Sequence, residues 1–209
     1  GNGRWATKRG LPRTIGHKAG AETFRRIATY CKEIGVKYLT VYAFSTENWK
    51  RSADEVAAIM GLLKRYLLEA VDTMERDHIR LHFFGDMGLP EHLSADDFQA
   101  NVCLNYGGRD EILRAARSFA AACAAGERKP EELDEALFAS YLDSAGIPDP
   151  DLVIRPSGEL RLSNFLLWQS AYAEFYFTDV LWPDFDKAEL DRAIAAYHQR
   201  DRRFGGVKK

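Results

Sequence analysis

The stretch from Gly35 to Ser45, Gly-Val-Lys-Tyr-Leu-Thr-Val-Tyr-Ala-Phe-Ser, decides the fold class. Its β-branched and aromatic residues predict a strand over residues 36–44. Apolar residues before it recur at spacings of three and four, which predicts a helix over residues 20–34: Phe24, Ile27, Cys31 and Ile34. Gly35 ends this helix. After the strand, Ser52 and Glu55 form a capping box that opens a long helix with an apolar face.

The alternation of strands and helices continues along the chain. Further strands are predicted over residues 79–84, 98–104, 151–154 and 173–177, and helices over 110–124 and 130–142. Asp186 and Glu189 form a second capping box that opens a last helix. This pattern is typical of an α/β fold, and we predict a single domain over residues 1–209 with a mostly parallel central β-sheet flanked by helices. Residues 87–97 are short and polar for a crossover between parallel strands, so we expect further residues there.

Composition narrows the class of partner. The chain has 29 basic and 31 acidic residues and a formal net charge of −2, which argues against nucleic acid as a partner. Basic residues cluster between Arg4 and Lys18, which fits a small anionic ligand. The three cysteines, Cys31, Cys103 and Cys123, lie in apolar contexts and predict buried, reduced thiols and a cytoplasmic protein. No apolar run approaches the ~20 residues that a membrane-spanning helix needs.

The loop after the predicted strand 151–154 contains two arginines six residues apart, Arg155 and Arg161, on either side of a Pro-Ser-Gly turn. In α/β sheets ligands bind at the carboxyl ends of strands. Two planar guanidinium groups that face one anion suit a phosphate or diphosphate, and Ser163 adds a hydroxyl donor. The alternative is a solvated loop whose arginines pair with Glu159 and Asp151.

The opening stretch predicts a second anion site. Gly1 and Gly3 permit a close approach of the backbone, and Arg4, Arg13 and His17 add cationic or polar donors. We expect a loop here, followed by a helix that starts near residue 19 and points its positive end at the anion. His17 taken singly is better explained as a structural or capping residue.

A third set of polar residues, from Ser45 to Arg51, follows the first strand. Polar groups at the carboxyl end of a strand are placed to meet a ligand, and Arg51 offers a further phosphate donor. Trp49 is equally well explained by packing.

Together these segments resemble the cis-prenyltransferase family, and within it undecaprenyl diphosphate synthases. The resemblance rests on residues 1–6 (Gly-Asn-Gly-Arg-Trp-Ala), 42–49 (Tyr-Ala-Phe-Ser-Thr-Glu-Asn-Trp), 105–109 (Asn-Tyr-Gly-Gly-Arg), 155–184 and 202–206 (Arg-Arg-Phe-Gly-Gly). It spans nearly the whole chain. It implies an enzyme that condenses isopentenyl diphosphate with an allylic diphosphate, farnesyl diphosphate being expected, to give a long-chain cis-polyprenyl diphosphate. Undecaprenyl diphosphate, the lipid-carrier precursor of cell-wall synthesis, is the expected product.

The resemblance also implies roles for individual residues. Arg4, Arg13 and His17 would hold the allylic diphosphate, and Arg155, Arg161 and Ser163 the isopentenyl diphosphate. Glu174 would assist Mg²⁺, and Asn48 would take part in removing the proton. The residues expected to contact substrate are Gly1, Asn2, Gly3, Arg4, Trp5, Arg13, His17, Ser45, Thr46, Glu47, Trp49, Arg51, Arg155, Arg161, Leu162 and Ser163. An essential Asp would stand immediately before Gly1, so we expect that residue and a preceding strand in the full-length protein.

An apolar tunnel would have to hold the growing chain. The expected walls are the strand 79–84 and the apolar helix face with Met60, Leu63, Leu67 and Val71, although each of these residues is equally well explained as ordinary core. The resemblance further implies a homodimer in which the tail around Arg203 and Gly205 reaches the neighbouring site, and transient contact with the membrane that receives the lipid product. The competing hypotheses are a non-catalytic partner subunit of a prenyltransferase complex and a nucleotide- or nucleic-acid-binding module.

Overall fold

The computed structural model covers the 209-residue chain and describes residues 1–77, 79–85 and 98–200, with side chains of the first range described as far as Arg65. The described residues form two compact units. Unit 1 comprises residues 1–27, 150–161 and 172–200, and unit 2 comprises residues 28–149 and 162–171. The expected single domain stays a prediction, and the expected extra residues near 87–97 lie outside the described residues.

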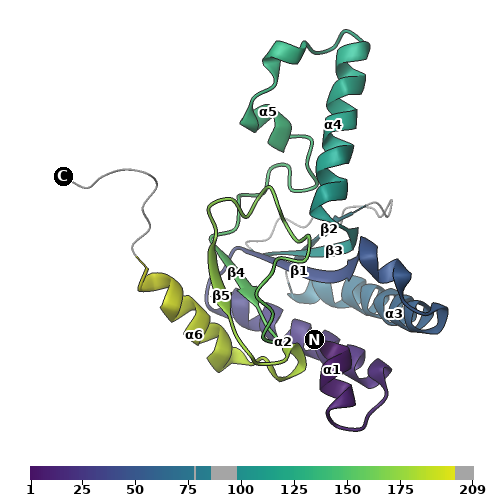
Figure 1. Cartoon of the computed structure of the whole chain (residues 1–209). Coiled ribbons are helices and arrows are strands. Elements are labelled where there is room, and N and C mark those ends of the chain that lie inside the picture. Colours follow the sequence, from purple (N-terminus) through teal and green to yellow (C-terminus); the bar gives the residue numbers. More distant parts are fainter. Residues whose placement is uncertain (78, 86–97, 201–209) are drawn as a thin grey trace. The chain divides into compact units, whose positions relative to one another are not determined.

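Unit 2 is built on a three-stranded parallel sheet (Figure 1). Its strands are β1 (Tyr38–Ser45), β2 (Arg80–Phe84) and β3 (Gln99–Tyr106), in the order β1-β3-β2. Val102 of β3 pairs with Val41 on one side and Phe83 on the other. All residues of β3 except Asn105 are buried, as expected of a central parallel strand that is covered on both faces.

The helices of unit 2 follow its strands. β1 leads into a short 3₁₀ helix, η1 (Thr46–Lys50), and then α3 (Ala53–Asp77). Ser52 accepts a hydrogen bond at 3.4 Å from the Glu55 N–H, which agrees with the predicted N-cap of α3. β3 leads directly into α4 (Gly108–Ala124).

The helix predicted over residues 130–142 is wrong in its extent. The structure has a 3₁₀ turn, η2 (Pro130–Glu132), and a separate short helix, α5 (Glu135–Ala139). Leu133 and Asp134 are extended between them, and the Asp134 side chain accepts a hydrogen bond from the Leu137 N–H at 2.7 Å. An N-capping Asp needs a non-helical backbone, so it begins a new helix and cannot continue the previous one.

Unit 1 contains a parallel pair of strands, β4 (Leu152–Arg155) and β5 (Glu174–Phe177), in the register Leu152↔Glu174. A 3₁₀ turn, η3 (Trp182–Asp184), leads to α6 (Lys187–His198). The Asp186 side chain caps α6 by accepting from the Glu189 N–H at 2.8 Å, as the second capping box predicts. Every strand pairing among the described residues is parallel, as predicted, although they form two sheets and not one.

The start of the chain differs from the predicted loop. Residues Asn2–Thr7 form a helix, α1, and the next helix, α2 (Arg13–Glu33), begins at Arg13 and not near residue 19. Pro12 stands immediately before α2 and accepts from the Ile15 N–H at 3.0 Å, a start signal that the prediction missed. Asn2 lies against Gly16 and Gly20, where a Cβ would overlap Asn2 atoms. The glycines therefore let α1 approach α2 closely.

A cluster of buried residues in unit 2 joins Phe84, Cys103, Tyr106 and Leu166. Met60 and Leu63, two of the expected tunnel residues, are half-buried, and the side chains of Leu67 and Val71 lie outside the described residues. The tunnel therefore stays a prediction. Within the described part of the chain, no helix is long and apolar enough to cross a membrane.

The three thiols should differ in reactivity. Cys31 is 2% exposed and Cys103 is fully buried, whereas Cys123 is half-buried, so the prediction of three buried thiols is wrong for Cys123. It lies near the C-terminal end of α4. Burial raises the pKa of Cys31 to about 11 and the pKa of Cys103 well above its usual value.

Because the thiolate is the reactive form, a thiol reagent should modify Cys123 first in the native protein. Mass spectrometry of peptides after brief labelling measures this order, and equal labelling of all three would contradict it.

Candidate active site

In unit 1, one carboxylate joins two of the predicted phosphate-binding arginines. Arg4 lies 2.7 Å from one oxygen of Glu159, and Arg161 pairs with the other oxygen. Partial desolvation alone would raise the pKa of Glu159, but Arg161 and Arg4 outweigh it and lower that pKa. The structure therefore brings together two arginines that lie far apart in the sequence. The alternative pairing predicted for Arg161 with Glu159 is present, and Arg4 joins it.

Other predicted anion-binding residues also lie in unit 1. A Cβ on Gly3 would lie 2.9 Å from the Arg13 Nε, so the Arg13 guanidinium lies directly against the Gly3 backbone. Gly1 is the N-cap of α1. Arg155 is the last residue of β4, at the carboxyl end of that strand, as predicted. His17 lies on the second turn of α2 and is half-buried.

Trp5 connects α1 to the turn at η3 within unit 1. Its indole Nε1 donates to the Asp184 carboxylate at 2.7 Å, and the Arg9 guanidinium lies 4.3 Å from the centre of the Trp5 ring. Arg9 also pairs with Asp184 at 3.1 Å. These contacts join α1 to the turn at η3, which the spacing of residues in the sequence did not suggest.

In unit 2, Asn48 forms a local ring of hydrogen bonds at the end of β1. Its Nδ2 donates to the Ser45 hydroxyl at 2.8 Å, and its Oδ1 accepts from the Ser45 N–H at 3.4 Å. Both polar groups of the amide are therefore engaged in capping η1. This holds the side chain in a fixed orientation at the carboxyl end of a parallel strand, where ligands of α/β sheets bind.

The segment 162–166 lies beside this turn. Asn164 donates from Nδ2 to the Glu47 carboxylate at 2.9 Å, and its Oδ1 accepts from the Arg109 N–H at 2.9 Å. The Asn164 carbonyl accepts from the Gly108 N–H at 2.7 Å. A Cβ on Gly107 would lie 2.7 Å from the Asn164 side chain and 2.8 Å from the Thr46 hydroxyl. Two predicted site residues, Thr46 and Glu47, are thus held against the segment that includes Leu162 and Ser163.

Backbone strain marks the same segment. Ser163, Asn164 and Leu166 have positive φ angles of 52°, 63° and 44°. This left-handed conformation costs a residue with a Cβ roughly 1–2 kcal/mol, and Asn adopts it more readily than most. Strained residues persist where surrounding contacts hold them, and they concentrate at functional sites.

Trp49 and Arg51 complete the description of the β1 turn. The Trp49 Nε1 donates to the Asn105 Oδ1 at 2.7 Å, and its ring packs edge-on against Phe44 at 5.1 Å between centroids, while half of the residue remains exposed. The contact with Phe44 agrees with a packing role for Trp49, and its exposed half agrees with the predicted contact with substrate. Arg51 pairs with Glu55 at 2.7 Å and remains partly exposed.

Glu174, the expected Mg²⁺ ligand, is the first residue of β5. Its side chain is 27% exposed and lies 2.5 Å from Arg200. The described residues contain no group of three or more His, Cys, Asp or Glu side chains able to hold a metal ion. Magnesium in phosphate-binding sites commonly uses one or two carboxylates together with substrate phosphates and water. A single accessible carboxylate at Glu174 fits that pattern, provided that the metal displaces Arg200.

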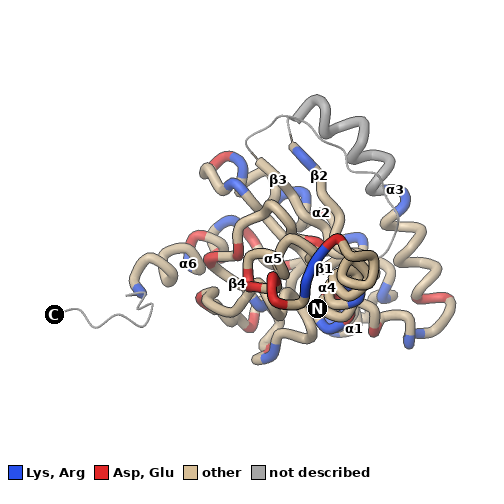
Figure 2. The backbone as a smooth tube through the Cα atoms, turned by 90° about the horizontal axis from the view of Figure 1, so that it is seen from above, with Lys and Arg blue, Asp and Glu red and all other residues tan. Residues whose placement is uncertain are grey.

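Several residues that organise the site were not predicted as part of it. Glu159, Asn164 and Asn105 each bind a predicted site residue. Glu159 could have been found because it lies between two arginines in one loop. Asn105 and Asn164 offered only a weak signal, the tolerance of Asn for positive φ. Figure 2 shows that basic and acidic residues are interspersed along the described backbone.

Comparison with known proteins agrees with this arrangement. A family model described as "Putative undecaprenyl diphosphate synthase" matches residues 1–205. The chain is 50% identical to an isoprenyl transferase of Heliobacterium mobile over 221 residues, covering 100% of this chain and 85% of the relative. It is 48% identical to an isoprenyl transferase of Clostridium perfringens, covering 100% of this chain and 87% of the relative.

Two solved structures are similar as well. Lavandulyl diphosphate synthase from Lavandula x intermedia, in complex with dimethylallyl diphosphate, aligns with a TM-score of 0.91 and 37% identity, covering 99% of this chain and 94% of that one. A probable undecaprenyl diphosphate synthase from Campylobacter jejuni aligns with a TM-score of 0.75 and 35% identity, covering 90% of this chain and 93% of that one.

The fold and the site thus define a prenyl-transferring enzyme. The chain belongs to the undecaprenyl diphosphate synthase family of cis-prenyltransferases, also called isoprenyl transferases.

Removal of the Glu159 charge should strengthen anion binding in unit 1. In Glu159→Gln, Arg4 and Arg161 lose the carboxylate that now neutralises them, so inorganic pyrophosphate should bind about two- to fivefold more tightly at low salt. Isothermal titration calorimetry measures the affinity, and the gain should shrink as salt is raised. Glu131→Gln, which removes one exposed carboxylate from unit 2, is the control for net charge. Weaker pyrophosphate binding by Glu159→Gln would show that Glu159 holds the arginines in place and does not compete with the anion.

Proposed function

We propose that this enzyme condenses isopentenyl diphosphate repeatedly with an allylic diphosphate, farnesyl diphosphate as the first acceptor, to give undecaprenyl diphosphate. The observation that supports this most directly is the pairing of Arg4 and Arg161 with the two oxygens of Glu159. It brings one arginine assigned to each substrate to the same carboxylate, and guanidinium groups bind phosphate oxygens in the way that they bind carboxylate oxygens. The isoprenyl transferase relatives, and the dimethylallyl diphosphate complex of the lavandulyl enzyme, support diphosphate substrates.

The residues divide between two substrates in this proposal. Gly1, Gly3, Arg4, Arg13 and His17 hold the allylic diphosphate, whose carbon–oxygen bond breaks as pyrophosphate leaves. The negative charge that develops on the leaving group is stabilised by these donors. Two further residues of α1 hold that helix in place: Asn2 contacts α2, and Trp5 donates to Asp184.

Isopentenyl diphosphate is held by Arg155, Arg161 and Ser163, with Leu162 beside them. Its double bond attacks the allylic carbon, a new carbon–carbon bond forms, and a proton is then lost. The Asn48 amide is not basic, and both of its polar groups are engaged with Ser45. We therefore assign to Asn48 the orientation of the group that accepts the proton, a diphosphate oxygen or water. Ser45, Thr46, Glu47, Trp49 and Arg51 form the wall around the substrates.

Mg²⁺, when bound, neutralises diphosphate charge and so assists departure of the leaving group. Glu174 is the residue of this chain that we assign to it, together with the Asp expected before Gly1. The remaining parts of the proposal are an apolar tunnel that includes Met60 and Leu63, a homodimer, and a cytoplasmic enzyme that contacts the membrane transiently when it releases its lipid.

The second candidate, a non-catalytic partner subunit, predicts loss of the diphosphate-binding arginines or of the Asn48 turn. This chain retains both, and Arg4, Arg161 and Asn48 each make ordered contacts. The catalytic proposal is therefore preferred.

An elongation assay tests the proposed function directly. Full-length protein with Mg²⁺, farnesyl diphosphate and labelled isopentenyl diphosphate should give a lipid product of eleven prenyl units, sized by thin-layer chromatography. A shorter or longer product would contradict the proposed chain length but would still support the condensation reaction. Absence of any elongation would overturn the catalytic proposal in favour of the partner subunit.

Arg161→Ala should act mainly on one substrate. Loss of a charge-assisted contact of about 1.5–3 kcal/mol should raise the KM for isopentenyl diphosphate roughly 10- to 100-fold, with little change in the KM for farnesyl diphosphate. Steady-state kinetics with each substrate varied in turn measures both values. Arg117→Ala, an exposed arginine of α4, is the matched control. An unchanged KM for isopentenyl diphosphate would move that substrate's site away from Arg161.

Glu174→Gln should raise the Mg²⁺ concentration needed for half-maximal elongation, because it removes a carboxylate that is proposed to bind the metal. A Mg²⁺ titration at saturating substrate measures the change, with Glu131→Gln as the control. If the requirement is unchanged while the protein loses thermal stability, Glu174 serves only its ion pair with Arg200.

A further inference from the structure

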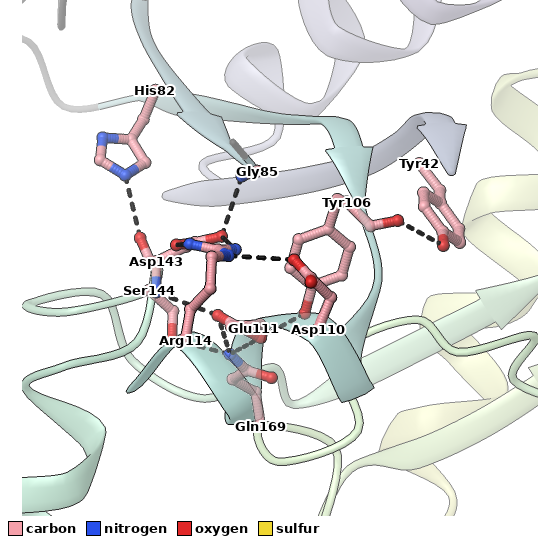
Figure 3. A network of polar contacts seen from close by, with 10 residues as sticks. All are labelled: Tyr42, His82, Gly85, Tyr106, Asp110, Glu111, Arg114, Asp143, Ser144 and Gln169. Atoms are coloured by element: carbon pink, nitrogen blue, oxygen red, sulfur yellow. Dashed lines mark hydrogen bonds and ion pairs between the residues drawn. The ribbon is translucent and has the colours of Figure 1, made fainter. Parts of the chain in front are cut away.

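A fully buried carboxylate in unit 2 binds the loop that carries Ser163. Glu111, on the first turn of α4, is 1% exposed. It accepts hydrogen bonds from the Tyr106 hydroxyl at 2.5 Å, from the Asp143 N–H at 3.0 Å and from the Gln169 Nε2 at 3.0 and 3.2 Å (Figure 3). The groups that converge on it are donors, which suits an ionised carboxylate because that group only accepts.

The three donors come from three different segments. Tyr106 is the last residue of β3, Asp143 belongs to the turn after α5, and Gln169 belongs to the strained loop 162–171. Gln169 also donates to the Ser144 hydroxyl at 2.9 Å. Glu111 is therefore the point at which the loop is attached to the sheet and to α4.

The rest of the network is arranged around a different carboxylate. Arg114 makes a two-pronged contact with Asp143 at 2.8 and 2.9 Å and also pairs with Asp110. Asp143 further accepts from the Gly85 N–H, and its carbonyl lies 3.1 Å from the His82 ring nitrogen. This part of the network contacts no residue of the loop 162–171 in any interaction shown in Figure 3. It offers a control within the same network.

The loop is held by apolar packing, which includes the stacking of Phe165 on Tyr42, and by hydrogen bonds at two positions. At one, Asn164 binds Glu47, Gly108 and Arg109. At the other, Gln169 binds Glu111, and Leu166 between them is 3% exposed with a φ of 44°. Because three of its residues are left-handed and are not glycine, the loop should relax when the hydrogen bonds at either position are lost. Ser163 lies on this loop, next to Asn164.

We propose that Glu111 is a positioning residue for the reaction: through Gln169 it holds the strained loop 162–171 so that Ser163 stays in place beside the Glu47–Asn48 turn. The inference rests on the proposed function, because it gives Glu111 a role through Ser163 and the isopentenyl diphosphate that Ser163 is proposed to bind. Glu111 itself touches no substrate. Its effect on catalysis is transmitted by the geometry of the loop alone.

The first test measures the loop directly. In Glu111→Gln a donor replaces an acceptor, so one of the converging donors loses its partner. Hydrogen exchange followed by mass spectrometry should show at least tenfold faster exchange of residues 162–171, at a temperature where the variant remains folded. Gln169→Leu, which keeps Glu111 and removes the loop's donor, should give the same result if Glu111→Gln proves too unstable. Arg114→Gln should leave the exchange of the loop within twofold of the unaltered protein.

The second test measures catalysis. Glu111→Gln should lower kcat/KM for isopentenyl diphosphate at least tenfold, through a higher KM, and leave the KM for farnesyl diphosphate within twofold. Arg114→Gln should lower the melting temperature without that selective effect. The double variant Glu111→Gln with Gln169→Glu returns a carboxylate to the same contact and should recover part of the lost kcat/KM, because an amide and a carboxylate still face each other.

These measurements separate the two proposals. Unchanged exchange of the loop in both Glu111→Gln and Gln169→Leu would overturn the inference, whatever the activity. A mobile loop with an unchanged KM for isopentenyl diphosphate would overturn it too, because Glu111 would then be structural only. If the unaltered protein shows no elongation at all, the proposed function fails, and the role of Glu111 in that reaction fails with it.

Discussion

The arrangement of unit 2 depends on the parallel pairing of β3 with both of its neighbours. Because β1 and β3 run in the same direction, their carboxyl ends meet at one edge of the sheet. That single constraint places the turn after Ser45 beside Asn105, where Trp49 donates to the Asn105 side chain. It also places Gly107 beside Thr46, and because Gly107 has no Cβ there is room for the Asn164 side chain between them. The polar groups of the site are therefore neighbours because the strands are parallel.

Buried and half-buried carboxylates fix the geometry beyond the sheet. Glu159 holds two arginines of unit 1, and Glu111 holds three segments of unit 2. Each gathers donors from distant parts of the chain, but their surroundings differ. Partial desolvation alone would raise the pKa of Glu159, but Arg161 and Arg4 outweigh it and lower that pKa. An anionic substrate that binds these arginines would therefore displace a charged carboxylate. Burial raises the pKa of Glu111, and the hydrogen bonds from Tyr106 and Gln169 oppose that effect without reversing it.

Sequence patterns predicted the repetitive elements well and their interruptions poorly. The strand at residues 36–44 and the caps at Ser52 and Asp186 were confirmed because each depends on neighbours within a few residues. The loop expected at the start proved to be α1, because its packing against Gly16 and Gly20 is a contact between separate helices. The helix expected over residues 130–142 was divided because Asp134 caps a new helix, a possibility that apolar spacing alone does not reveal.

The sequence by itself determined the α/β class, the parallel pairing, the family and most of the residues proposed to bind substrate. These follow from local periodicity, from capping and from motifs of contiguous residues, all of which are readable along the chain. Only the tertiary structure showed that Glu159 lies between Arg4 and Arg161, that Asn164 binds Glu47, and that Glu111 lies behind the loop 162–171. Such contacts join residues far apart in sequence, and the geometry that decides them exists only once the strands have paired and the helices have packed.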